Sequence, residues 1–212
     1  MTERMTSIST ILLAAGSGSR FGGRKLLAPY LGKTLIEATL DGLREAPVDE
    51  TIVVVGRDAE ELRSVCEPYG VRVVENPEWE EGLSTSVRAG LAATGAKVRA
   101  WVVLLADQPL VGSEAVAKLA AAFESGVEVA VATYRGAPRN PVLFARKVWP
   151  LLEEELSGDE GARGFIRRHP ELVTEVPCDD VADPADVDTV EDLGRLEERV
   201  AAGAAPETRR RT

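Results

Sequence analysis

Short apolar runs alternate with amphipathic stretches along the first two-thirds of this chain. The runs at 8–15, 51–55, 71–75 and 101–105 are rich in Val, Ile and Leu, as is typical of strands that are buried on both faces of a parallel sheet. Apolar residues at helical spacing lie between them. This alternation predicts an α/β fold with a mostly parallel sheet and right-handed crossovers.

The polar residues that flank the apolar stretches predict where the helices begin. Thr34 followed by Glu37 forms a capping box before a helix over 35–45. Ser84 or Ser86 is the expected N-cap of the helix that follows the polar loop after residue 75. The remaining predicted helices cover about 58–66, 113–123, 146–156, 161–168 and 189–201, and the remaining strands cover 127–134, 141–145 and 172–177.

A glycine-rich loop follows the first strand directly. It contains Gly16, Gly18, Gly22 and Gly23, interleaved with Ser17, Ser19 and the cations Arg20, Arg24 and Lys25. Glycines let a ligand approach the backbone closely, and successive N–H groups in such a turn form an anion site. The sequence therefore predicts a phosphate-binding loop at the carboxyl end of the first strand.

Two other interpretations of this loop fit its residues less well. A dinucleotide fingerprint needs an acidic residue at the end of the second strand, where this chain has Gly56-Arg57. A plain surface turn needs fewer glycines than four and no interleaved cations. Both rank below phosphate binding.

Composition and charge narrow the function classes. The chain has 212 residues, 44% hydrophobic and 28% charged, with a net charge of -10. This charge disfavours binding to nucleic acid or to membrane surfaces. No apolar run is long enough for a membrane helix, and the first residues lack a signal-peptide pattern.

Cys66 and Cys178 are isolated, so we expect free thiols, no zinc site and a cytoplasmic location. We expect one domain over 1–201 and a disordered tail over 202–212.

Acidic residues supply candidate metal ligands. Asp107 directly follows the apolar strand 101–105 and Ala106, at the sheet edge where ligands bind in open α/β folds. Mg²⁺ is typically held by one or two carboxylates together with substrate phosphates, so we rank a metal ligand above a turn residue here. A second acidic cluster spans 179–188, and it matters only if the fold brings Asp186 or Asp188 near Asp107.

Six segments in order resemble one family. They are LAAGSGSRFGGRK (13–25), ENPEWEEGLSTSVRAGL (75–91), LLADQPLV (104–111), RNPVLFAR (139–146), GDEGAR (158–163) and DVDTVEDL (186–193). Together they resemble the MobA-like nucleotidyltransferases, and most of all the molybdenum cofactor cytidylyltransferases. The fold implied is a Rossmann-like three-layer sandwich of the nucleotide-diphospho-sugar-transferase type.

The resemblance implies roles for individual residues. Lys25, Arg20 and Asp107 would be catalytic, and Mg²⁺ would bind Asp107 and Asp188, with Asp186 an open alternative. The nucleotide would be bound by Leu13, Ala14, Ala15, Gly16, Ser17, Gly18, Arg20, Lys25, Gly82, Ser84, Thr85, Ser86 and Asp107. The acceptor would be bound by Arg135, Asn140, Pro141, Asp159 and Arg163.

The implied reaction is transfer of a nucleoside monophosphate to a phosphorylated acceptor with release of pyrophosphate. The Leu-Ala-Ala-Gly start of the loop resembles the cytidylyltransferases, so CTP is the expected donor and molybdopterin the expected acceptor. A molybdoenzyme or its chaperone would be a downstream partner. The alternatives are transfer to another small phosphorylated acceptor, an NAD(P)-dependent oxidoreductase similar to nicotine blue oxidoreductase, and a non-catalytic nucleotide-binding regulator.

Overall fold

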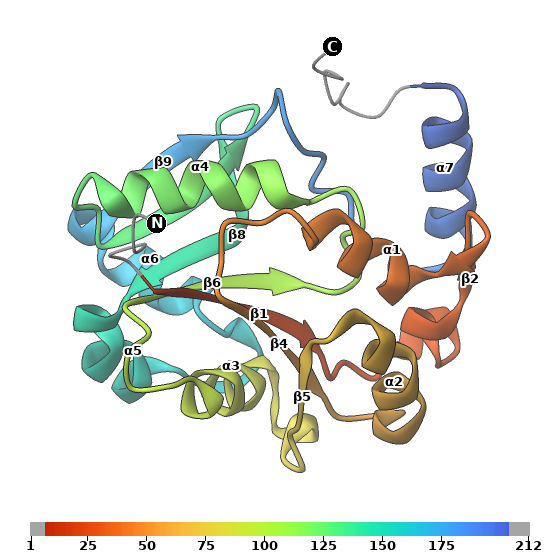
Figure 1. The fold of residues 1–212 in the computed structure, drawn as a ribbon, viewed down its shortest axis with the longest axis horizontal. Coiled ribbons are helices and arrows are strands. Elements are labelled where there is room, and N and C mark those ends of the chain that lie inside the picture. Colours follow the sequence, from red (N-terminus) through yellow and green to blue (C-terminus); the bar gives the residue numbers. More distant parts are fainter. Residues whose placement is uncertain (1–6, 204–212) are drawn as a thin grey trace.

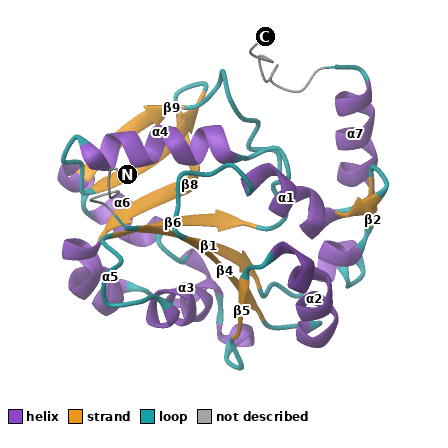
Figure 2. Cartoon of the chain, viewed as in Figure 1, coloured by secondary structure: helices purple, strands orange, loops and turns teal. Residues whose placement is uncertain are grey.

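The structure, a computed structural model, describes residues 7–203. Seven strands form one sheet in the order β5-β4-β1-β6-β8-β7-β9 (Figures 1 and 2). Their bounds are β1 Ile8–Ala14, β4 Glu50–Val55, β5 Arg72–Glu75, β6 Ala100–Leu105, β7 Val129–Tyr134, β8 Ala137–Ala145 and β9 Val173–Pro177. Only β8 is antiparallel to its neighbours in this sheet. The predicted α/β fold with a mostly parallel sheet is confirmed.

Helices cover both faces of the sheet (Figure 1). The helices are α1 Leu35–Leu43, α2 Ala59–Cys66, α3 Leu83–Ala93, α4 Ser113–Glu124, α5 Trp149–Glu155, α6 Arg163–Arg168 and α7 Val190–Ala201. Residues of α1, α2, α4 and α7 share one buried apolar cluster with the sheet. Residues of α3, α5 and α6 share the cluster on the opposite face. The chain therefore has three layers, as the resemblance implied.

Strand β1 lies between β4 and β6, so the ends of these three strands are neighbours. Leu12 packs into one apolar cluster while Ile11 and Leu13 pack into the other, because successive side chains of a strand point to opposite faces. On either side, Ala14 pairs with Val55 of β4 and Leu13 pairs with Leu105 of β6. The loops that follow these three strands consequently leave the sheet side by side.

Several local predictions differ from the structure. The connection before α1 contains a small hairpin, β2 Pro29–Tyr30 with β3 Lys33–Thr34. The predicted strand 141–145 is the second half of the longer β8. The expected N-cap at Ser84 or Ser86 is wrong, because α3 begins at Leu83 with Gly82 as its N-cap. The capping boxes at Thr34 and Thr189 are both present.

The closing helix α7 ends shortly before the last described residue. α7 ends at Ala201, and residues 204–212 of the predicted tail lie outside the described residues. Within residues 7–203, no helix has both the length and the apolar character needed to cross a membrane.

Candidate active site

A network of four charged side chains lies at the carboxyl ends of β1 and β6. Lys25 Nζ lies 2.6 Å from Asp107 Oδ2 and 3.6 Å from Asp188 Oδ1. Arg20 Nη2 lies 2.9 Å from Asp188 Oδ2. The Lys25 and Asp107 side chains are only 14% and 20% exposed, whereas Arg20 is 73% exposed. The fold thus joins residues from the glycine loop, from the end of β6 and from the segment before α7.

The glycine loop turns Lys25 toward the carboxylates. The N–H of Gly23 donates to the carbonyl of Gly18 over 3.0 Å, which closes the loop. Gly18 has a φ of 59°, and a Cβ at this position would lie 3.1 Å from Lys25 Cβ. Arg24 takes the left-handed conformation, with a φ of 50°, and its side chain is 64% exposed. After the reversal at Arg24, Lys25 points to the carboxylates, whereas the Arg24 side chain is largely exposed and also lines the pocket described below.

Hydrogen bonds hold the acidic segment 183–188 against the end of β6. The N–H of Val187 donates to the carbonyl of Asp107 over 3.0 Å. The Gln108 side chain donates from Nε2 to the carbonyl of Pro184 over 3.2 Å. Of the two aspartates left open above, Asp188 therefore joins the network, whereas Asp186 lines a separate hollow. The metal-binding role of Asp188 stays a prediction.

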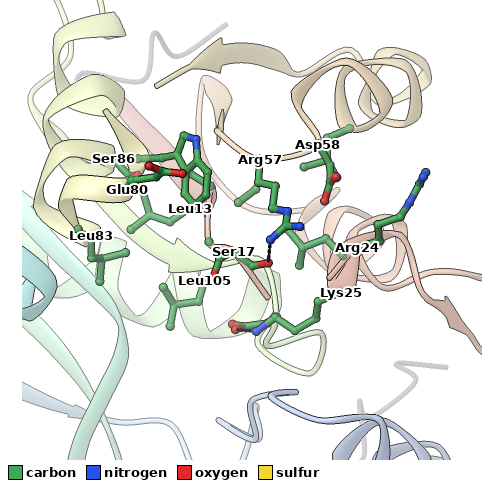
Figure 3. Close-up of a pocket in the computed structure, with 18 of the residues that line it drawn as sticks. Leu13, Ser17, Arg24, Lys25, Arg57, Asp58, Glu80, Leu83, Ser86 and Leu105 are labelled. Atoms are coloured by element: carbon green, nitrogen blue, oxygen red, sulfur yellow. Dashed lines mark hydrogen bonds and ion pairs between the residues drawn. The ribbon is translucent and has the colours of Figure 1, made fainter. Parts of the chain in front are cut away.

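A pocket of about 350 Å³ opens beside this network (Figure 3). Lys25, Arg57 and Asp58 border one side, and Ser86, Glu80 and Leu83 border the other (Figure 3). The predicted nucleotide-binding residues that line the pocket are Leu13, Ala14, Ala15, Gly16, Ser17, Lys25, Gly82, Ser86 and Asp107. The others, Gly18, Arg20, Ser84 and Thr85, do not line it.

Hydrogen bonds of Thr85 stabilise the side of the pocket that residues 76–82 and the start of α3 form. Its hydroxyl donates over 2.9 Å toward the carbonyls of Glu78 and Gly82. The Asn76 side chain donates from Nδ2 to Thr85 Oγ1 and to Ser86 Oγ, over 2.9 and 3.0 Å. Thr85 is buried, and these contacts fix the 76–82 loop against the start of α3. They also orient Ser86, the member of this group that faces the pocket.

Arg57 and Trp79 are among the pocket residues that were not predicted from the sequence. Arg57 follows β4, and its Nη1 donates to the carbonyl of Ser17 over 3.2 Å (Figure 3). Trp79 also lines the pocket, and it packs so closely on Gly56 that a Cβ at Gly56 would lie 2.5 Å from the indole. The position of Arg57 at a strand end beside β1 was the available signal, since parallel strand ends share one edge of the sheet. Trp79 carried no comparable signal.

The predicted acceptor residues do not form one group. Asp159 lines the same pocket as Lys25. Arg135 lines the separate hollow with Asp186, while Asn140 and Pro141, joined by a cis peptide bond in β8, border neither. Arg163 is exposed at the first position of α6 and borders neither. Of the five residues, only Asp159 therefore reaches the pocket beside the charged network.

The carboxylates fit a divalent cation that is shared with a substrate. Asp107 Oδ1 is buried without a hydrogen-bond partner, and such an atom is costly unless a ligand satisfies it. Within residues 7–203, no cluster of three or more His, Cys, Asp or Glu side chains could hold a metal. Two carboxylates completed by phosphate oxygens are what Mg²⁺ ordinarily uses. The donor set therefore fits a metal that binds together with a phosphorylated ligand.

Comparison with known proteins identifies relatives over most of the chain. Residues 10–173 match the model of the MobA-like NTP transferase domain. The chain is 36% identical over 199 residues to nicotine blue oxidoreductase of Paenarthrobacter nicotinovorans, covering 89% of this chain and 96% of that protein.

Two solved structures from Mycobacterium tuberculosis H37Rv are similar. Rv0371c superposes with a TM-score of 0.80 at 33% identity, covering 92% of this chain and 99% of the other. The Rv0371c complex with manganese has a TM-score of 0.79 at 30% identity, covering 91% and 98%.

Proposed function

Because the chain belongs to the MobA-like NTP transferase family, we propose that it is a Mg²⁺-dependent transferase of CMP from CTP to molybdopterin. The family assignment supports nucleotidyl transfer in general. CTP is favoured by the sequence Leu13-Ala14-Ala15-Gly16, which resembles the cytidylyltransferases. The acceptor is a phosphorylated small molecule, and molybdopterin is the one we propose. A molybdoenzyme or its chaperone would receive the product.

The observation that carries the proposal is the contact of Lys25 with both Asp107 and Asp188 beside the glycine loop. A phosphate-binding loop alone fits many ligands. A lysine and two carboxylates at its edge supply what a metal–triphosphate complex needs: ligands for the cation and a positive charge for the phosphates.

Each residue has a defined task in the proposed reaction. An oxygen of the acceptor phosphate forms a bond to the α-phosphorus of CTP, while the bond from that phosphorus to the bridging α–β oxygen breaks. Pyrophosphate leaves with the electron pair of that bond. Lys25 offsets the negative charge that develops on the leaving group, and Arg20 holds the β- and γ-phosphates. Asp107 and Asp188 would hold Mg²⁺, which would neutralise part of the negative charge of the phosphates.

No general base is needed, because a phosphate nucleophile is already ionised at neutral pH. The single histidine of the sequence is consistent with this. His169 Nε2 lies 2.8 Å from Glu155 Oε1, in a contact between the ends of α5 and α6, and it does not line the pocket. Positioning and charge are therefore the two contributions of the protein.

For the acceptor, we propose a position on the Asp159 side of the pocket. Asp159 reaches the pocket because Gly82 and Gly158 pack closely: a Cβ at Gly82 would lie 2.6 Å from the carbonyl carbon of Gly158. Arg163, Asn140 and Pro141 stay candidates for contacts with a larger acceptor. We also propose a cytoplasmic location, since Cys66 and Cys178 are free thiols, as is usual in a reducing compartment.

Formation of a nucleotidylated product tests the proposed function. The purified chain is incubated with CTP, GTP or ATP, with and without Mg²⁺, in the presence of molybdopterin, and the products are identified by mass spectrometry. We expect a cytidylylated product that requires Mg²⁺. Product with GTP or ATP in preference to CTP would keep the chemistry and overturn the choice of base. No nucleotidylated product with any triphosphate would overturn the proposed function for this acceptor.

A second candidate, NAD(P)-dependent reduction, is favoured by the similarity to nicotine blue oxidoreductase. Arg57 follows β4 at the place where dinucleotide folds carry their ribose-binding acid, and an arginine there suits the 2′-phosphate of NADP. Oxidation of NADPH in the presence of an oxidised heteroaromatic dye, unaffected by chelation of divalent cations, would favour this candidate over nucleotidyl transfer.

A further inference from the structure

Lys25 lies where a divalent cation would also have to bind. Its ammonium contacts Asp107 Oδ2 at 2.6 Å and Asp188 Oδ1 at 3.6 Å. These are the two carboxylates that, under the proposed function, hold the metal. One ammonium therefore bridges both prospective ligands, and a cation that used Asp107 Oδ2 would have to displace it.

The competition is strong because the contact is largely shielded from water. The side chains of Lys25, Asp107 and Asp188 are 14%, 20% and 27% exposed. Interactions between unit charges at such separations are several times stronger in a partly buried site than in bulk water. A free cation must therefore lose hydration water and also break an existing ion pair.

A triphosphate removes this obstacle. Lys25 is the last residue of the glycine loop, so phosphates bound by that loop would lie within reach of its four-carbon side chain. Phosphate oxygens are an alternative partner for the ammonium. Once it turns to them, Asp107 Oδ2 becomes free for the metal, beside the buried, unpartnered Asp107 Oδ1. Asp188 keeps its ion pair with Arg20 Nη2 at 2.9 Å, while the other N–H groups of the guanidinium stay available for the phosphates. Asp188 is thus held in place while Lys25 moves.

We propose that Lys25 is an internal counter-ion that keeps the Asp107–Asp188 site closed to a free divalent cation until a nucleoside triphosphate draws its ammonium away. This inference rests on the proposed function. It makes binding of metal and triphosphate mutually dependent, because two ligands that favour the same rearrangement raise each other's affinity equally.

Mn²⁺ binding without nucleotide tests the inference directly. Free Mn²⁺ is measured by electron paramagnetic resonance during titration of the full chain, its Lys25→Met variant and a Lys33→Met control. Lys33 forms an ion pair with Asp41 elsewhere on the surface, so the control removes one positive charge and one Lys–Asp pair away from the site. We expect Lys25→Met to bind Mn²⁺ about tenfold more tightly than the wild type, or better, and Lys33→Met to match the wild type.

Two further arms make the result specific. Adding Asp107→Asn to Lys25→Met should abolish the gain in Mn²⁺ affinity. A non-hydrolysable CTP analogue should raise the Mn²⁺ affinity of the wild type, and it should raise that of Lys25→Met less, because the ammonium no longer has to be displaced. If Lys25→Met fails to fold, Lys25→Gln takes its place in the same titration, because it also removes the positive charge.

Equal Mn²⁺ affinity of Lys25→Met and the wild type would overturn the inference. Wild-type Mn²⁺ affinity that is the same with and without the analogue would overturn it as well. The arm with Mn²⁺ alone contains no nucleotide, so its failure is distinguishable from failure of the proposed transfer, which is read from the product with CTP and acceptor.

Discussion

Gly90 of α3 offers a sharp test of how the pocket wall is attached to the sheet. The helix packs on the apolar face that contains Ile11 and Val54, and Gly90 is the point of closest approach. A Cβ at Gly90 would lie 2.4 Å from Ile11 Cγ2 and 3.1 Å from Val54 Cγ2. Because both side chains are fully buried in β1 and β4, α3 would have to move outward, and Ser86 would move with it.

The magnitude follows from two opposing contributions. Replacing glycine by alanine inside a helix stabilises by roughly 1 kcal/mol through backbone propensity. Overpacking of a well-packed interior costs about 1–3 kcal/mol. Gly194 of α7 isolates the first contribution, since a Cβ there meets nothing within 4 Å. The difference between Gly90→Ala and Gly194→Ala should therefore equal the overpacking cost, about 1–3 kcal/mol.

Thermal unfolding of the two variants measures this difference. At about 2–4 °C per kcal/mol for a chain of this size, we expect Tm of Gly90→Ala to lie roughly 2–12 °C below that of Gly194→Ala. Gly194→Ala should be at least as stable as the wild type. A Gly90→Ala protein that gains as much stability as Gly194→Ala would refute the close packing of α3 on β1 and β4.

Other perturbations address the site and the peripheral contacts. Asp107→Asn should lower the rate of nucleotide transfer by a factor of about 10²–10³ without changing the far-UV circular dichroism spectrum. A variant with the wild-type rate would refute the assignment of Asp107 to the active site. His169→Gln should show a pH-dependent loss of stability: the Glu155 hydrogen bond raises the pKa of His169 above its ordinary 6.5, and His169 lowers the pKa of Glu155 below its ordinary 4.5. The stabilisation from His169 is complete below pH 6.5 and disappears as the pH rises through its raised pKa, and that from Glu155 disappears as the pH falls through its lowered pKa. The difference in unfolding midpoint between wild type and variant should thus be largest between pH 4.5 and 6.5, and a difference constant from pH 4 to 9 would contradict this. Thr189→Ala removes the cap that accepts from the N–H of Asp192 over 3.1 Å and should cost about 1 kcal/mol in urea unfolding, whereas no change would argue against this capping box.

The sheet and much of the site could be predicted because they depend on local patterns. Apolar strands such as 101–105 and the capping box at Thr34 follow from residue types over a few positions. The rule that ligands bind at the carboxyl ends of parallel strands then placed Asp107 near the glycine loop. The contact of Lys25 with Asp107 agrees with that expectation.

The rest depended on contacts between distant segments. The proximity of Asp188 to Asp107 results from the docking of residues 183–188 on the end of β6. The residue pattern left Asp186 and Asp188 both open, and only the family resemblance of segment 186–193 favoured Asp188. Gly82 caps α3 because its backbone must approach Gly158, so the usual preference for serine at an N-cap misplaced the start of the helix. Arg135 was grouped with the acceptor residues through resemblance, yet β7 and β8 carry it to a different hollow.

Metal and nucleotide are proposed to bind together at Asp107. The most direct test is the thermal stabilisation of the wild type and of Asp107→Asn by CTP, measured with Mg²⁺ and with a chelator. Ligand binding to the folded chain raises its stability by RT ln(1 + [L]/Kd). The proposed function predicts stabilisation of the wild type by CTP only when Mg²⁺ is present, and little or none of the variant. Equal stabilisation of both proteins, or stabilisation by NADPH alone without a metal, would contradict the account.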